Sequence, residues 1–123
     1  MSPENAIKLL ANPTRVAVLK WLKDPEEAFA DYSQLFPFKQ YGVCASLIQD
    51  MAGLSQPATS LCLKSLHDAG LLEASTVGTW TYYLRCEQRI VEMTHSVTHA
   101  LQALYYGCQW QERPDNIRYL LVD

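Results

Sequence analysis

The sequence lacks several features that would place it in other classes of protein. It has no uninterrupted run of the roughly eighteen apolar residues that a membrane span needs, and its first residues carry neither the basic nor the apolar region of a signal peptide. No glycine-rich phosphate loop, Gly-x-Ser-x-Gly elbow or His-Glu-x-x-His motif occurs. We therefore expect a cytoplasmic protein that is not an enzyme.

Positive charge is also scarce. Charged residues make up 19% of the chain, and 10 Lys and Arg against 13 Asp and Glu give a formal net charge of -3. Non-specific affinity for DNA comes mostly from neutralisation of phosphates by Lys and Arg. A strongly basic nucleic-acid-binding protein is therefore excluded, and any binding to DNA has to rely on specific contacts.

What is present fits one globular domain over residues 1–123, since a chain of 123 residues that is 49% hydrophobic is about the size of one ordinary core. Ser2-Pro3-Glu4 and Asn12-Pro13-Thr14 each combine a capping residue with a proline at the first helical position. They predict two helices, the second running to about Lys23. Residues 24–41 keep no period and contain two prolines, which predicts a long connection and a candidate surface for a partner or ligand.

Two further helix signals follow closely on one another. Residues 44–52 carry an apolar stripe that stops at Gly53, and Ser55-Gln56-Pro57 starts a helix that ends at Gly70. Two short helices joined by a tight turn predict a helix-turn-helix at about 44–70. One face of the second helix is mainly apolar and the other polar, the polar face comprising Gln56, Ser60, Lys64 and His67, and the packed face Ala58, Cys62, Leu66 and Ala69.

The rest of the chain predicts a wing, a long helix and a tail. Residues 71–77 and 80–85 are rich in strand formers and flank a Gly78-Thr79 turn, which predicts a hairpin at about 71–85. A long helix is expected at about 88–112, and the tail at 114–123 is left open between strand and helix. The predicted fold is mainly α with a small β-hairpin. The apolar positions of the long helix that step by four and three, and so suggest helix pairing, are Ile90, Thr94, Val97, Leu101, Leu104 and Cys108.

In their order and spacing, five short stretches make the chain similar to the arsenical-resistance-repressor (ArsR) family of winged helix-turn-helix regulators. The stretches are Asn12-Pro13-Thr14-Arg15, Leu54-Ser55-Gln56-Pro57, Leu63-Lys64-Ser65-Leu66, Ala69-Gly70-Leu71 and Trp80-Thr81-Tyr82-Tyr83. The resemblance implies a homodimer joined through its first and last helices, with one recognition helix per subunit in the major groove of a palindromic operator. It also implies a repressor that leaves DNA when an inducer binds.

The family pattern and the helical wheel together select the residues expected to meet double-stranded DNA. Gln side chains bond adenine in the major groove, Ser and Thr serve bases or phosphates, and a helix N-terminus supplies amides. The selected residues are Ser55, Gln56, Thr59, Ser60, Lys64 and, at the wing tip, Thr79.

The same segment keeps a different function open. Between Val43 and Arg85, two cations stand against three anions, which leaves a formal charge of -1. A winged helix with so little positive charge is also suited to docking another protein, with residues 24–41 as part of the surface. The alternative is therefore a protein-protein interaction module with little or no binding to DNA.

The inducer is predicted only by class. The four cysteines, at positions 44, 62, 86 and 108, show no Cys-x-x-Cys spacing, so neither a zinc ribbon nor a disulfide framework is indicated. Cys44 lies where arsenite- or cadmium-sensing relatives carry a Cys-x-Cys pair, although Ala45-Ser46 follows it here. Cys44 and Cys108 are the candidate sensing thiols, with ordinary packing as the alternative for Cys108.

His95 and His99 are the weak candidates for metal ligands. They are spaced i, i+4 on the last helix, a spacing that places two imidazoles on one metal ion, and solvent-facing or interface histidines are the alternative. The sequence requires no cofactor. A thiol-reactive species, a metal ion or metalloid, and a small ligand all remain open as the inducer.

Overall fold

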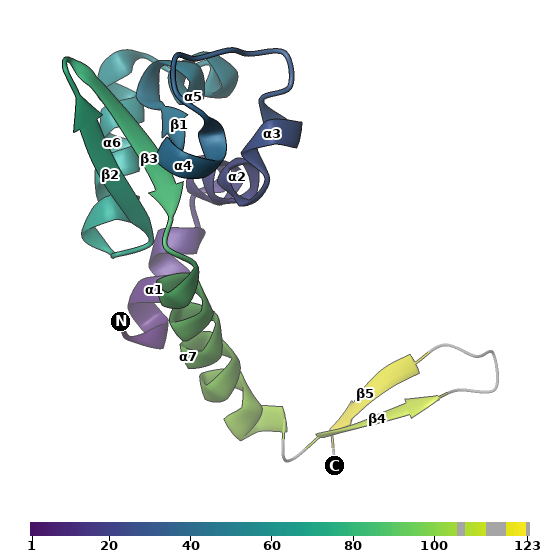
Figure 1. Cartoon of the computed structure of the whole chain (residues 1–123). Coiled ribbons are helices and arrows are strands. Elements are labelled where there is room, and N and C mark those ends of the chain that lie inside the picture. The colour runs from purple at the N-terminus through teal and green to yellow at the C-terminus, as the bar shows by residue number, and fades with distance from the viewer. Residues whose placement is uncertain (106–107, 113–117, 123) are drawn as a thin grey trace.

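The computed structural model describes residues 1–105, 108–112 and 118–122, with side chains described for residues 1–102. This part of the chain is mainly helical, with a three-stranded antiparallel sheet in the order β1-β3-β2 and a separate pair of strands, β4 and β5 (Figure 1). In chain order the elements are α1 (Pro3–Leu10), α2 (Pro13–Lys23), α3 (Pro25–Ala28), α4 (Phe38–Tyr41), β1 (Val43–Cys44), α5 (Ala45–Ala52), α6 (Gln56–Asp68), β2 (Leu72–Val77), β3 (Trp80–Arg85), α7 (Glu87–Tyr105), β4 (Cys108–Glu112) and β5 (Arg118–Val122).

The helix starts predicted from capping signals are confirmed. The Ser2 hydroxyl accepts the Asn5 amide at 3.2 Å in front of α1, and the Asn12 side chain accepts the amides of residues 14 and 15 in front of α2. Ser55 accepts the Ala58 amide at 3.3 Å in front of α6. A cap of this type stabilises a helix by about 1 kcal/mol, and the proline that follows is preset for the first turn.

One hydrophobic core joins the helix-turn-helix to the helices before and after it. The side chains of Val18 on α2, Ile48 on α5, Leu66 on α6 and Met93 on α7 are all buried in one cluster. Burial of each such side chain stabilises the fold by about 1.5–3 kcal/mol. The core therefore fixes the orientation of α6, and with it the face that α6 presents to solvent.

The connection at residues 24–41 is packed against the domain rather than looped away from it. It contains the short helices α3 and α4, and Phe29 within it is fully buried. The Phe29 ring meets Trp21 edge-on at 6.3 Å and Tyr32 at 5.7 Å between ring centroids. The periodicity of the sequence missed this packing because the contacts are made by single aromatic side chains, not by a repeating stripe.

The Gln34 side chain joins the connection to β1 by hydrogen bonds. Its side-chain amide donates to the carbonyl oxygens of Phe36 at 2.8 Å and Gly42 at 2.7 Å, and its side-chain oxygen accepts the backbone N–H of Cys44 at 2.9 Å. A second tie joins the connection to α5, where the Tyr32 hydroxyl donates to Asp50 at 2.6 Å. Together these bonds hold residues 24–41 against the start of the helix-turn-helix.

The wing is larger than the sequence predicted. The hairpin of β2 and β3 is confirmed in register, with Val77 opposite Trp80 across the Gly78-Thr79 turn. The two-residue strand β1 adds to it, since Val43 pairs with Tyr83 on the open side of β3. The backbone enters β1 through residue 42, whose φ of 86° favours glycine and where a Cβ would collide with the carbonyl of residue 83.

The last helix is shorter than expected. It was predicted to continue to residue 112, but α7 ends at Tyr105, and residues 108–112 form β4 instead. β4 pairs antiparallel with β5, which places Trp110 opposite Leu120. The apolar tail therefore supplies a strand partner that competes with continuation of the helix.

The apolar seam predicted on this helix is partly used within the chain. Ile90 and Val97 pack against the core beside the buried Met93, and α7 lies alongside α1 (Figure 1). Leu101 is 56% exposed. Leu104 and Cys108 lie outside the residues whose side chains the structure describes.

Candidate nucleic-acid interface

The helix-turn-helix is built by a glycine turn and a serine cap. α5 ends at Gly53, which adopts a left-handed conformation with φ 66° and ψ 29° and donates its N–H back to the last turn of α5. Ser55 then caps α6, two residues later. Since left-handed backbone is easiest for glycine, this turn fixes the approach of the two helices within three residues.

α6 presents a polar face to solvent. Leu63 and Leu66 are buried against the core, whereas Gln56, Ser60 and Lys64 are exposed. The Ser55 cap precedes this face and is also exposed. The helix therefore turns the polar side chains of Gln56 and Ser60 outward along its first two turns.

Thr59 is placed differently from the expectation. Its side chain is 4% exposed, and its hydroxyl donates to the carbonyl oxygen of Ser55 at 2.9 Å. The helical wheel had placed Thr59 with the outward residues and Ala58 with the packed ones, but the core rotates α6 so that Thr59 faces inward and Ala58 outward. Thr59 thus supports the first turn of α6 instead of offering a hydroxyl to DNA.

The wing and α6 enclose a small pocket. Its volume is about 280 Å³, and Gln56, Thr59 and Ser60 line it from α6 while Thr79 and Trp80 line it from the wing. The structure therefore brings together four of the six residues predicted to meet DNA. Ser55 and Lys64 lie outside this pocket, at the cap of α6 and further along its exposed face.

Both cations of the segment 43–85 already have partners. Lys64 binds Asp68 at 2.7 Å on the surface of α6, and this carboxylate raises the pKa of the Lys64 ammonium. Arg85 binds Glu87 at 2.8 Å and donates to the carbonyl oxygen of Leu19 at 2.9 Å. The segment 43–85 therefore has both of its cations paired as well as a formal charge of -1.

Cys44 lies at the edge of the same pocket. It is the residue before α5, its side chain is buried, and its sulfur lies 3.2 Å from the Ser46 hydroxyl oxygen. The thiol is thus close to Gln56 and the wing. The side chain of Cys108 lies outside the described residues, so its role as a sensing thiol stays a prediction.

His95 and His99 are both exposed on α7 and line a shallow hollow with Glu92. Among the side chains that the structure describes, no group of three or more His, Cys, Asp or Glu is placed to hold a metal ion. Within the described residues, the two histidines therefore form no complete ligand set.

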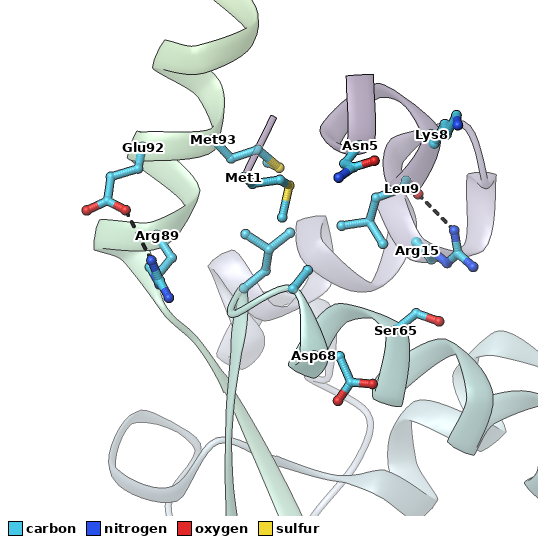
Figure 2. Close-up of a pocket in the computed structure, with 12 residues that line it drawn as sticks. Met1, Asn5, Lys8, Leu9, Arg15, Ser65, Asp68, Arg89, Glu92 and Met93 are labelled. Atoms are coloured by element: carbon cyan, nitrogen blue, oxygen red, sulfur yellow. Dashed lines mark hydrogen bonds and ion pairs between the residues drawn. The ribbon is translucent and has the colours of Figure 1, made fainter. Parts of the chain in front are cut away.

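A larger groove of about 640 Å³ lies between α1, α7 and the end of α6 (Figure 2). Met1, Leu9 and Met93 line its middle, and the Arg89–Glu92 pair stands at one side with 3.5 Å between charged atoms. At the other side the Arg15 guanidinium donates to the carbonyl oxygen of Leu9 at 3.3 Å. The groove follows the contact between the two helices expected to form a dimer.

Two residues on the surface of α6 and the wing were not selected from the sequence. Trp80 is about half exposed at the wing and lines the pocket, although only Thr79 had been selected there. Leu61 is 68% exposed on α6, between Ser60 and Lys64. The helical position of Leu61, opposite the packed face, could have identified it as exposed. It was not selected as a DNA contact because its side chain is apolar.

Comparison with known proteins gives one informative relative. No family model matches the chain. The chain is 38% identical over 90 residues to the uncharacterised HTH-type transcriptional regulator YbzH of Bacillus subtilis (strain 168), which covers 73% of this chain and 89% of that protein. No helix in the described part of the chain is long and apolar enough to cross a membrane.

Proposed function

Because this chain belongs to the helix-turn-helix-type transcriptional regulators, we propose that it acts as a homodimeric, ArsR-type repressor. In this proposal α6 enters the major groove of an operator, the wing approaches the adjacent backbone or minor groove, and an inducer releases the DNA. The sequence resemblance and the three-stranded winged arrangement both support this assignment.

The observation that carries the proposal is the outward polar face of α6 beside the wing. Gln56 and Ser60 are exposed and line one pocket with Thr79. A glutamine amide matches the N6 donor and N7 acceptor of adenine, and serine hydroxyls serve bases or phosphates. The capped start of α6 adds backbone amides and a positive dipole directed at phosphate.

Dimerisation through α1 and α7 is part of the proposal. Ile7 on α1 and Val91 and Leu101 on α7 are all exposed, and each would gain by burial in a subunit interface. A two-fold axis between the subunits would present the two α6 helices to successive major grooves, roughly 34 Å apart. The operator is then expected to be palindromic.

Three inducer classes remain within the proposal. Cys44 supports a thiol-reactive inducer because it lies at the edge of the pocket between α6 and the wing. His95 and His99 would bind a metal ion only with further ligands, because the described side chains of the chain do not complete a site with them. The groove along α1 and α7 offers room for a small ligand.

The decisive test is binding of the reduced protein to its own upstream promoter fragment, measured by gel shift for wild type and for the double variant Gln56→Ala with Ser60→Ala. We expect the double variant to lose sequence-selective binding while its circular dichroism and unfolding midpoint stay unchanged. The matched control is Ser33→Ala with Gln40→Ala, which removes one exposed serine and one exposed glutamine side chain from the connection at residues 24–41. Unchanged operator affinity of the α6 variant would refute the assignment.

Additions to the same assay separate the inducers and the alternative function. Release of DNA by mild oxidation would indicate a thiol-reactive inducer, and release by zinc or arsenite would indicate a metal ion or metalloid. Release by none of these treatments would leave a small ligand. Absence of DNA binding by the wild type under every condition would favour the protein-docking module, with residues 24–41 as the first surface to examine.

A further inference from the structure

α6 carries an apolar strip beside its polar face. Leu61 is 68% exposed, and Pro57 and Ala58, which lie four and three residues before it, are exposed as well. Residues three and four apart lie on the same side of a helix. The strip is therefore continuous over the first two turns, next to Gln56 and Ser60.

Leu61 has no role in holding the domain together. Buried contacts of α6 are made by Thr59, Leu63 and Leu66 on the opposite side of the helix. The free protein instead keeps a large apolar side chain in water on the helix that enters the major groove in the proposed function. A contact that only the complex makes would explain that placement.

DNA offers one matching group in the major groove. Each base pair there displays hydrogen-bond donors and acceptors, and thymine alone adds a methyl group, at C5. An A·T pair thus shows a donor and an acceptor on adenine, and a methyl group beside the O4 acceptor on thymine. The two strips of α6 have the same division.

We propose that Leu61 is a specificity-determining residue that packs against thymine C5-methyl groups, so that α6 reads both edges of A·T pairs. This inference rests on the proposed function, since it requires α6 to lie in the major groove. It gives the protein discrimination without positive charge, which suits a helix whose lysine, Lys64, is already paired.

The test removes the methyl group alone. A duplex site is first selected from a random library with the full-length wild-type protein, and each thymine in the site is then replaced in turn by deoxyuridine, which keeps every hydrogen-bonding group. Affinities are measured for wild type, for Leu61→Ala and for the matched control Leu35→Ala. Leu35 is an exposed leucine in the connection, 83% accessible and remote in sequence from α6.

We expect one thymine per half-site to be sensitive. Loss of its methyl group should weaken wild-type binding about fourfold, the value for one buried methyl-sized group. Leu61→Ala should bind the thymine site at least as weakly as wild type binds the deoxyuridine site, and should show no further loss with deoxyuridine. Leu35→Ala should behave as wild type, and alanine at position 61 is compatible with the helix.

The outcomes distinguish this inference from the proposed function. If Leu61→Ala binds as tightly as wild type, or stays equally sensitive to every deoxyuridine, Leu61 does not read methyl groups although the protein binds DNA. If the wild type selects no DNA, both the proposed function and this inference are wrong. A selected site without thymine in either half-site would overturn the inference while leaving operator binding established.

Discussion

Replacing Gln34 with alanine should loosen the connection from the helix-turn-helix. The Gln34 side chain makes three hydrogen bonds to backbone groups, at 2.8, 2.7 and 2.9 Å. A bond of this kind contributes about 0.5–1.5 kcal/mol net, and an unsatisfied buried partner costs more. Partial exposure of the site and the recovered freedom of the side chain offset part of the loss, which leaves about 2–3 kcal/mol.

Urea unfolding measures this effect directly. A loss of about 2–3 kcal/mol should lower the unfolding midpoint by about 1–1.5 M if the slope is near 2 kcal/mol per molar urea. Gln40→Ala is the control, because Gln40 is an exposed glutamine of the same connection and an exposed site changes stability by less than about 0.5 kcal/mol. Gln34→Glu should be destabilised at neutral pH as well, since it places a carboxylate against two carbonyl oxygens.

A second readout locates the damage. Gln34 accepts the N–H of Cys44, so its loss should expose that thiol and speed its labelling by a thiol reagent, followed by peptide mapping. Equal stability of Gln34→Ala and Gln40→Ala, with equal labelling of Cys44, would show that the connection is held by its aromatic contacts alone.

Three further predictions concern charge, backbone and assembly. Asp68→Asn frees Lys64, so operator affinity should rise. The slope of log affinity against log salt concentration should steepen by about 0.9 for each phosphate that is newly contacted, and an unchanged slope would exclude Lys64 from the interface. Gly42→Ala should prevent stable folding, whereas Gly53→Ala, which meets open space, should cost only about 1–2 kcal/mol for its left-handed backbone; similar melting temperatures would contradict this. Leu101→Glu should shift the proposed dimer toward monomer in sedimentation analysis, and an unchanged mass would place the interface elsewhere.

Local signals made much of this fold predictable. A capping side chain followed by proline marks the start of α1, α2 and α6 in the sequence itself, and Gly53 marks the turn between α5 and α6. The wing hairpin follows from a Gly78-Thr79 turn between strand formers. Each of these features depends on residues within a few positions of one another.

The features that were missed depend on contacts between distant segments. Gln34 bonds Cys44 ten residues away, and no pattern around Gln34 marks it as different from Gln40. Thr59 faces inward because the core, not the wheel, sets the rotation of α6. The end of α7 was misplaced because β5, which pairs with β4, is read from the sequence only as an apolar tail.

The neutralised reading surface also bears on how such a protein would find its site. Sliding and hopping along a duplex depend on sequence-independent attraction to phosphates. With Lys64 engaged by Asp68 and a formal net charge of -3 on the chain, that attraction is small. Under the proposed function, the search would proceed mainly by repeated three-dimensional encounters, and few molecules would be held on the rest of the genome between them.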